Sequence, residues 1–161
     1  MFGTNLNGEH VFLAERPVEE SFEDFKGKFC TMSAIFNFLN RFERKYRIEG
    51  EDYFAVQFSD GVKSEVDKGK YTIQKNGVLL VEDNNVLLPA MWLQIPSMIA
   101  YSADGYKKRT WVLPADCFTS SKVSLYRISH TGREFVGKKS IGNGKITLTL
   151  ASNEMLLITQ E

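Results

Sequence analysis

The chain has 161 residues, of which 43% are hydrophobic and 25% are charged. This composition is typical of one soluble globular domain with a substantial core, and it excludes a largely disordered chain. Lys and Arg together number 20, as do Asp and Glu, so no overall charge favours binding to nucleic acid or to a membrane.

The N-terminal segment, residues 1–30, predicts an arm or short strand followed by a linker. It opens MFGTNLNGEHVFLAERP, which has neither the basic start nor the apolar run of a signal peptide. No segment of the chain reaches the roughly 20 apolar residues of a membrane helix. We therefore expect a soluble protein, secreted or periplasmic if it belongs to an exported parent. Cys30 and Cys117 lie in apolar surroundings and predict buried free thiols, with a disulfide as the alternative in an exported protein.

Residues 31–47, TMSAIFNFLNRFERKYR, predict the one helix. Ile35, Leu39, Phe42 and Tyr46 follow one another at spacings of four, three and four, which places them on one helical face. A Thr or Ser near the start supplies a cap, and a glycine at position 50 ends the pattern. We expect this face to pack in the core.

From residue 53 onward the pattern changes to short alternating strands, with turn signals about every 8 to 12 residues. Asn76-Gly77 is the strongest of these signals. About nine or ten strands after one helix favour an antiparallel two-sheet β-sandwich over residues 53–161, with a small β-barrel as the structural alternative. Residues 1–50 then form the arm and helix of the same single domain, 1–161.

No complete catalytic, metal or cofactor motif is present. His10 and His130 are the only histidines, and the two cysteines lack metal-ligand spacing. The segment GKKSIGNGK, residues 137–145, lacks the order of a phosphate-binding loop and is interpreted as a turn before a strand. Adjacent acidic residues fall in loops or near element ends, where solvated charge explains them. We predict no catalytic residue, no metal and no cofactor.

The segment IAYSADGYKKRTWVLPAD, residues 99–116, places three basic residues beside a tryptophan. With Asp104-Gly105 as a two-residue turn it predicts a hairpin in which Met98 faces Trp111. Alternation along the second strand would put Arg109 on the face of Trp111 and Tyr106 on the opposite face. The basic residues therefore do not form one patch, which argues against nucleic acid.

Two interpretations of Trp111 remain open from the sequence. In the first, the indole packs into the sandwich and Arg109 covers its rim. In the second, Trp111 or Trp92 is an exposed platform for a sugar ring, and Tyr106, Arg109 and Asp104 hydrogen-bond the sugar hydroxyls. These five residues are the candidate ligand-binding set.

The second half of the chain resembles the C-terminal β-sandwich domains that follow the catalytic barrel in many bacterial glycoside hydrolases. The resemblance rests on a WVLP segment, the strand KVSLYRIS, the turn HTGRE, the strand NGKITLTL and the closing strand NEMLLIT, mainly within residues 99–161. It implies an accessory domain that packs against a catalytic barrel of the same parent and that in some cases contacts carbohydrate.

The leading hypothesis is therefore a non-catalytic accessory module of a carbohydrate-active enzyme, with an interdomain role and glycan binding as a second role. A small stand-alone enzyme with an unidentified site and a protein-interaction domain are the alternatives. A deep pocket with converging polar groups would favour the enzyme.

Overall fold

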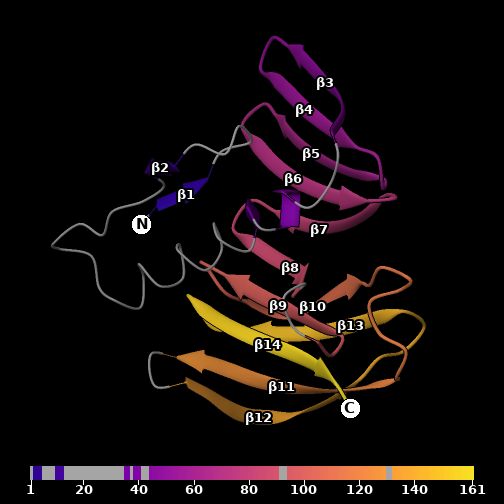
Figure 1. Ribbon diagram of the computed structural model, residues 1–161. Coiled ribbons are helices and arrows are strands. Elements are labelled where there is room, and N and C mark those ends of the chain that lie inside the picture. Colours follow the sequence, from indigo (N-terminus) through magenta and orange to yellow (C-terminus); the bar gives the residue numbers. More distant parts are fainter. Residues whose placement is uncertain are drawn as a thin grey trace, which may run out of the picture.

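The computed structural model describes residues 2–4, 10–12, 35–36, 38–40, 44–90, 94–129 and 132–161, and this part of the chain is mainly β-structure (Figure 1). Its strands are β1 Phe2–Thr4, β2 His10–Phe12, β3 Arg44–Gly50, β4 Tyr53–Phe58, β5 Val62–Asp67, β6 Lys70–Lys75, β7 Val78–Glu82, β8 Asn85–Pro89, β9 Ser97–Ser102, β10 Tyr106–Val112, β11 Lys122–Ser129, β12 Gly132–Ser140, β13 Lys145–Leu150 and β14 Glu154–Gln160.

Ten strands form one antiparallel sheet in the order β12-β11-β14-β9-β8-β7-β6-β5-β4-β3. From β3 to β9, each strand pairs with the next one in the sequence, so consecutive strands are neighbours in the sheet. Figure 1 shows the whole sheet as a column of strands from β3 to β12. The sheet is open, with β3 and β12 at its edges. Within the described residues the ladder does not close, so the barrel alternative is excluded and the predicted sandwich class holds.

Strands β10 and β13 form a separate antiparallel pair that provides the second layer of the sandwich. Trp111 of β10 and Ile146 of β13 are buried together with residues from the long sheet. The shared core comprises Leu87, Met98, Ala100, Trp111, Leu113, Val123, Leu125, Ile146, Leu148, Leu150, Leu156 and Ile158. Burial of these side chains joins the two layers, because apolar area removed from water stabilises the folded state by about 25 cal/mol per Å².

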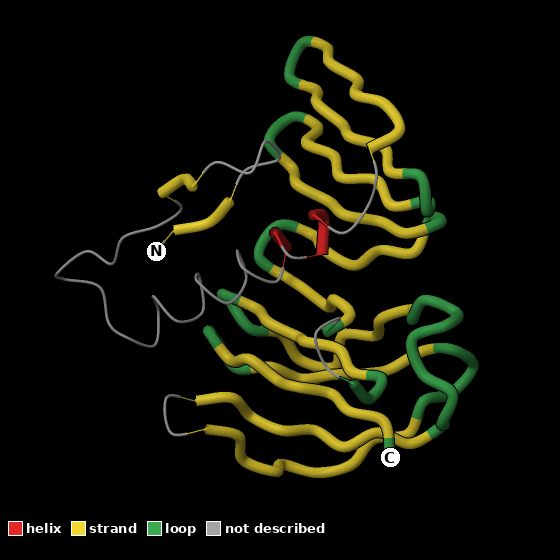
Figure 2. The backbone as a smooth tube through the Cα atoms, in the orientation of Figure 1, coloured by secondary structure: helices red, strands yellow, loops and turns green. Residues whose placement is uncertain are grey.

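The opposite face of the long sheet carries a second apolar cluster. Phe38, from the short helical segment drawn in red in Figure 2, is 2% exposed and packs with residues of the long sheet. Successive residues of a strand point to opposite faces, so Leu87 belongs to the first cluster and Leu88 to the second. The central strands of the sheet are therefore buried on both faces.

The predicted helix at 31–47 is wrong at its C-terminal end. Helical residues are described at 35–36 and 38–40, but β3 already begins at Arg44 and pairs with β4. The pair is closed by a tight turn, with Gly50 opposite Tyr53. Tyr46 follows Phe42 at a helical spacing of four but precedes Ile48 at the spacing of two typical of a strand, and the adjacent hairpin supplies the backbone hydrogen bonds that decide for the strand.

The predicted hairpin across Asp104-Gly105 is also wrong. Strand β9 pairs with β8 on one side and β14 on the other, whereas β10 pairs with β13 in the second layer. The physical reason is that β9 is a central strand, with Met98 and Ala100 fully buried. The chain therefore crosses from one sheet to the other between residues 102 and 106, where the Gly105 N–H donates to Ser102 Oγ at 2.9 Å.

Candidate functional site

Three residues of the predicted ligand-binding set, Tyr106, Arg109 and Trp111, come together on one face of β10. The ladder with β13 pairs Tyr106 with Leu150 and Arg109 with Leu148, so the residues between form a bulge. The bulge changes the alternation and brings Tyr106 onto the face of the other two. The prediction that Tyr106 points the opposite way was wrong for this reason.

Trp111 is buried in the sandwich and is only 2% exposed. Its indole N–H donates to the Tyr106 hydroxyl oxygen at 3.1 Å. This hydrogen bond satisfies the polar edge of the ring inside the core, as a buried tryptophan requires. Burial also raises the pKa of the Tyr106 hydroxyl, so it remains a neutral partner. The first interpretation of Trp111 is thus the one that the structure supports, and its ring is not an exposed platform.

Arg109 closes the cluster on its outer side. The centre of its guanidinium lies 4.2 Å from the Trp111 ring centroid and 5.7 Å from that of Tyr106. Its Nη2 donates to Glu82 Oε2 at 2.8 Å, and Lys70 Nζ contacts the other oxygen of that carboxylate at 2.9 Å. Lys70 and Arg109 lower the pKa of Glu82 and keep it ionised. The cluster links β10 to β7, because Arg109 of β10 is paired with Glu82 of β7. Its charged groups are therefore already engaged with one another.

The two remaining candidates lie apart from this cluster. Asp104 is exposed in the connection between β9 and β10. Trp92 lies outside the described residues. Whether any of the five residues binds a ligand stays a prediction.

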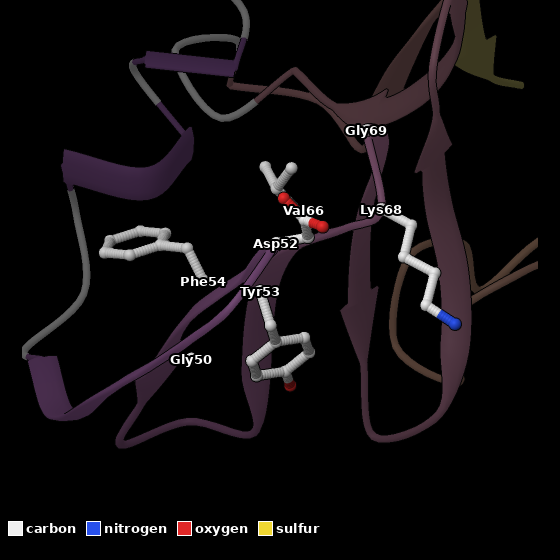
Figure 3. Close-up of a pocket in the computed structure, with 7 residues that line it drawn as sticks. All are labelled: Gly50, Asp52, Tyr53, Phe54, Val66, Lys68 and Gly69. Atoms are coloured by element: carbon white, nitrogen blue, oxygen red, sulfur yellow. The ribbon is translucent and has the colours of Figure 1, made fainter.

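A pocket of about 570 Å³ lies at the ends of two neighbouring hairpins, β3–β4 and β5–β6 (Figure 3). The Lys68 N–H donates to the Asp52 carbonyl oxygen at 2.8 Å and so joins the two turns. Phe54 and Val66 lie opposite each other in the ladder, and each is 36% exposed. The pocket is lined by Gly50, Asp52, Tyr53, Phe54, Val66, Lys68 and Gly69. Sequence reasoning missed it because it assigned residues 44–47 to a helix.

The polar groups beside this pocket contact one another, and these contacts stabilise the strand pair. In Figure 3 the Tyr53 ring points away from the Phe54 ring. The Tyr53 hydroxyl donates to Glu65 Oε2 at 2.6 Å, and Lys63 forms an ion pair with the same carboxylate. Lys63 first, and then Tyr53, lower the pKa of Glu65. An ionised carboxylate of this kind cannot act as a general acid near neutral pH, so this carboxylate does not provide the acid of a glycosidase pair.

A second pocket, of about 420 Å³, lies between the β6–β7 turn and the loop after β10. Cys117 lines it as a half-buried free thiol. Burial raises the pKa of this thiol to about 11, so it stays protonated near neutral pH and is a poor nucleophile. Cys30 lies outside the described residues, and a disulfide between the two cysteines is untested.

In the described part of the chain, no three His, Cys, Asp or Glu side chains gather in a way that could hold a metal ion. No helix among these residues is long and apolar enough to cross a bilayer.

The fold defines a β-sandwich, and comparison with known proteins relates part of it to a glycoside hydrolase. No family model matches the chain. The chain is similar to the "Putative endo-alpha-N-acetylgalactosaminidase" of Renibacterium salmoninarum, with 29% identity over 103 residues. The match covers 55% of this chain and 7% of that protein, so the chain spans a small part of the length of this curated relative. The match supports the expected relationship to a glycoside hydrolase, and the type of domain, an accessory β-sandwich, stays a prediction.

Proposed function

We propose that the chain is a non-catalytic β-sandwich module of a larger carbohydrate-active protein, with a structural role beside a catalytic domain and glycan binding as a second role. The observation that carries the proposal is the partial similarity to a glycoside hydrolase, of which this chain matches only 7%. A segment of that size is what an accessory domain contributes to a long multidomain enzyme.

The arrangement of polar groups supports the non-catalytic part of the proposal. The best-formed polar cluster, Arg109 with Glu82 and Lys70, binds two layers of the fold together. Glu65 is held ionised by its neighbours. Neither cluster provides two carboxylates of different pKa facing a cavity, which is the arrangement that most glycosidases use.

Hydrolysis assays separate this proposal from a small stand-alone enzyme. The 161-residue chain would be incubated with p-nitrophenyl α-N-acetylgalactosaminide and with a panel of other nitrophenyl glycosides. We expect no release of nitrophenol above the buffer rate. Turnover that co-elutes with the folded chain on gel filtration would overturn the non-catalytic assignment and favour the enzyme.

A further inference from the structure

An aromatic pair and an arginine lie together at the β12 edge of the long sheet. Tyr126 of β11 is opposite Phe135 of β12, and their ring centroids are 5.7 Å apart at an interplanar angle of 64°. The centre of the Arg133 guanidinium lies 4.8 Å from the Tyr126 centroid. We call Tyr126, Arg133 and Phe135 the β12 platform. It lies apart from the Trp111 cluster and from the pocket at the hairpin ends.

Phe135 is the most exposed large hydrophobic residue of the described chain, at 53%. Among the residues that the structure describes, β12 has β11 as its only neighbour in the ladder and so lies at a sheet edge. The Phe135 ring makes an edge contact with Tyr126 and is otherwise presented to solvent. An exposed aromatic ring beside polar groups is typical of a binding surface.

A bulge in β12 adds a lysine to the same face. The register with β11 shifts at Val136, so that Phe135 faces Tyr126 and Lys138 faces Ser124. Tyr126 and Ser124 are two residues apart in β11 and point to the same side. Without the bulge, Phe135 and Lys138 would point to opposite sides of the sheet.

Basic residues outnumber acidic ones in the two strands at this edge, although Arg127 is paired with Glu134 and Glu154 on the opposite face. Strands β11 and β12 together contain five basic residues and one acidic residue, a net charge of +4. On the face of the platform, Lys138 Nζ contacts Glu161 Oε1 at 2.7 Å, and Ser124 Oγ donates to the same oxygen at 3.2 Å. Alternation places Lys122 and Arg133 on this face too, so the described residues of β11 and β12 contribute three cations to the face that Glu161 reaches.

We propose that the β12 platform binds an acidic glycan, one whose sugar carries a carboxylate or a sulfate. The apolar face of a pyranose ring would pack on the exposed ring of Phe135, and its anionic group would be bound by Arg133, two residues earlier on the same face of the strand. Lys138, which is paired with Glu161, adds positive charge to this face. A guanidinium is suited to both anions because its N–H groups form paired hydrogen bonds with two oxygens. The inference deepens the proposed glycan-binding role and rests on it.

Titration with defined probes tests the inference. The probes are 3′-sialyllactose for the carboxylate, a sulfated heparin disaccharide for the sulfate, lactose as the neutral sugar and an oligothymidine as a competing polyanion. Binding to the chain would be followed by NMR chemical shifts and calorimetry. We expect one of the two acidic sugars to bind at least about tenfold more tightly than lactose and the oligonucleotide, with affinity falling as salt rises.

Matched variants locate the site. We expect Phe135→Ala and Arg133→Gln each to weaken acidic-sugar binding by about tenfold or more. Val112→Ala removes a side chain that is 49% exposed on β10, and Phe54→Ala removes the aromatic ring of the hairpin pocket, so neither should change the affinity. Thermal melting of each variant checks that the fold is retained.

Four results would overturn the platform: no binding of either acidic sugar, equal binding of lactose, tighter binding of the oligonucleotide, or wild-type affinity of Phe135→Ala. None of them bears on whether the chain belongs to a larger enzyme. That part of the proposed function is decided by the size and activity of the native polypeptide, so the two failures are distinguishable.

Discussion

Arg109 connects the two layers of the fold through contacts beyond their shared apolar core. Its guanidinium covers the Trp111 ring and pairs with Glu82 on β7. Cation–π contacts contribute about 0.5–2 kcal/mol, depending on how far they are desolvated, and exposed ion pairs contribute about 0–1 kcal/mol. Arg109 is therefore a stabilising residue, although its position beside a tryptophan also suits a ligand site.

Substitution of Arg109 by Ala should lower the free energy of unfolding by about 1–2 kcal/mol, because both contacts are lost. Lys107→Ala, an exposed position two residues earlier in β10, serves as the control and should change stability by less than about 0.5 kcal/mol. Urea denaturation followed by far-UV circular dichroism measures both. Equal midpoints for the two variants would show that Arg109 does not fasten the layers.

At the scale of elements, most strands could be predicted from the sequence. Asn76-Gly77 closes β6–β7 as expected, and both residues have positive φ, which such a turn requires. Pairing was harder to predict, because alternation shows that β9 and β10 are strands and does not show which strands they pair with. The bulge that turns Tyr106 toward Trp111 depends on the partner strand β13, so the sequence of β10 alone could not reveal it.

The crossing from β9 to β10 depends on Gly105, which has a φ of +76°. A Cβ at this position would lie 2.8 Å from the Leu150 carbonyl oxygen, part of the backbone of β13. Gly69, in the β5–β6 turn, has a similar φ of +80° but no atom within 4 Å of such a Cβ. Substituting each glycine by Ala therefore separates the cost of the left-handed backbone conformation, which both positions share, from the steric clash, which only position 105 has.

We expect Gly69→Ala to cost about 1–2 kcal/mol of unfolding free energy, the usual penalty for a left-handed conformation. Gly105→Ala should cost clearly more, because the backbone of β13 must also move. Thermal melts of the two variants under identical conditions provide the comparison. If Gly105→Ala is no less stable than Gly69→Ala, the close approach of residue 105 to the backbone at the end of β13 is wrong.

At the scale of the whole molecule, the β-sandwich class and the relationship to glycoside hydrolases could both be predicted from the sequence. The candidate site could not. Trp111 was a reasonable sugar platform as a residue type, but its 2% exposure depends on how two sheets pack. The β12 platform could not be predicted from the sequence either, because it depends on the register and the bulge of the β11–β12 pair.

The most direct test of the accessory-module assignment is the size and activity of the native polypeptide that contains this sequence. An antibody against the 161-residue chain would isolate that polypeptide from its source cells for mass measurement and glycosidase assay. The chain alone has a mass of 18.3 kDa. We predict a polypeptide several times heavier that hydrolyses glycosides; a native species of 18.3 kDa without glycosidase activity would contradict the assignment.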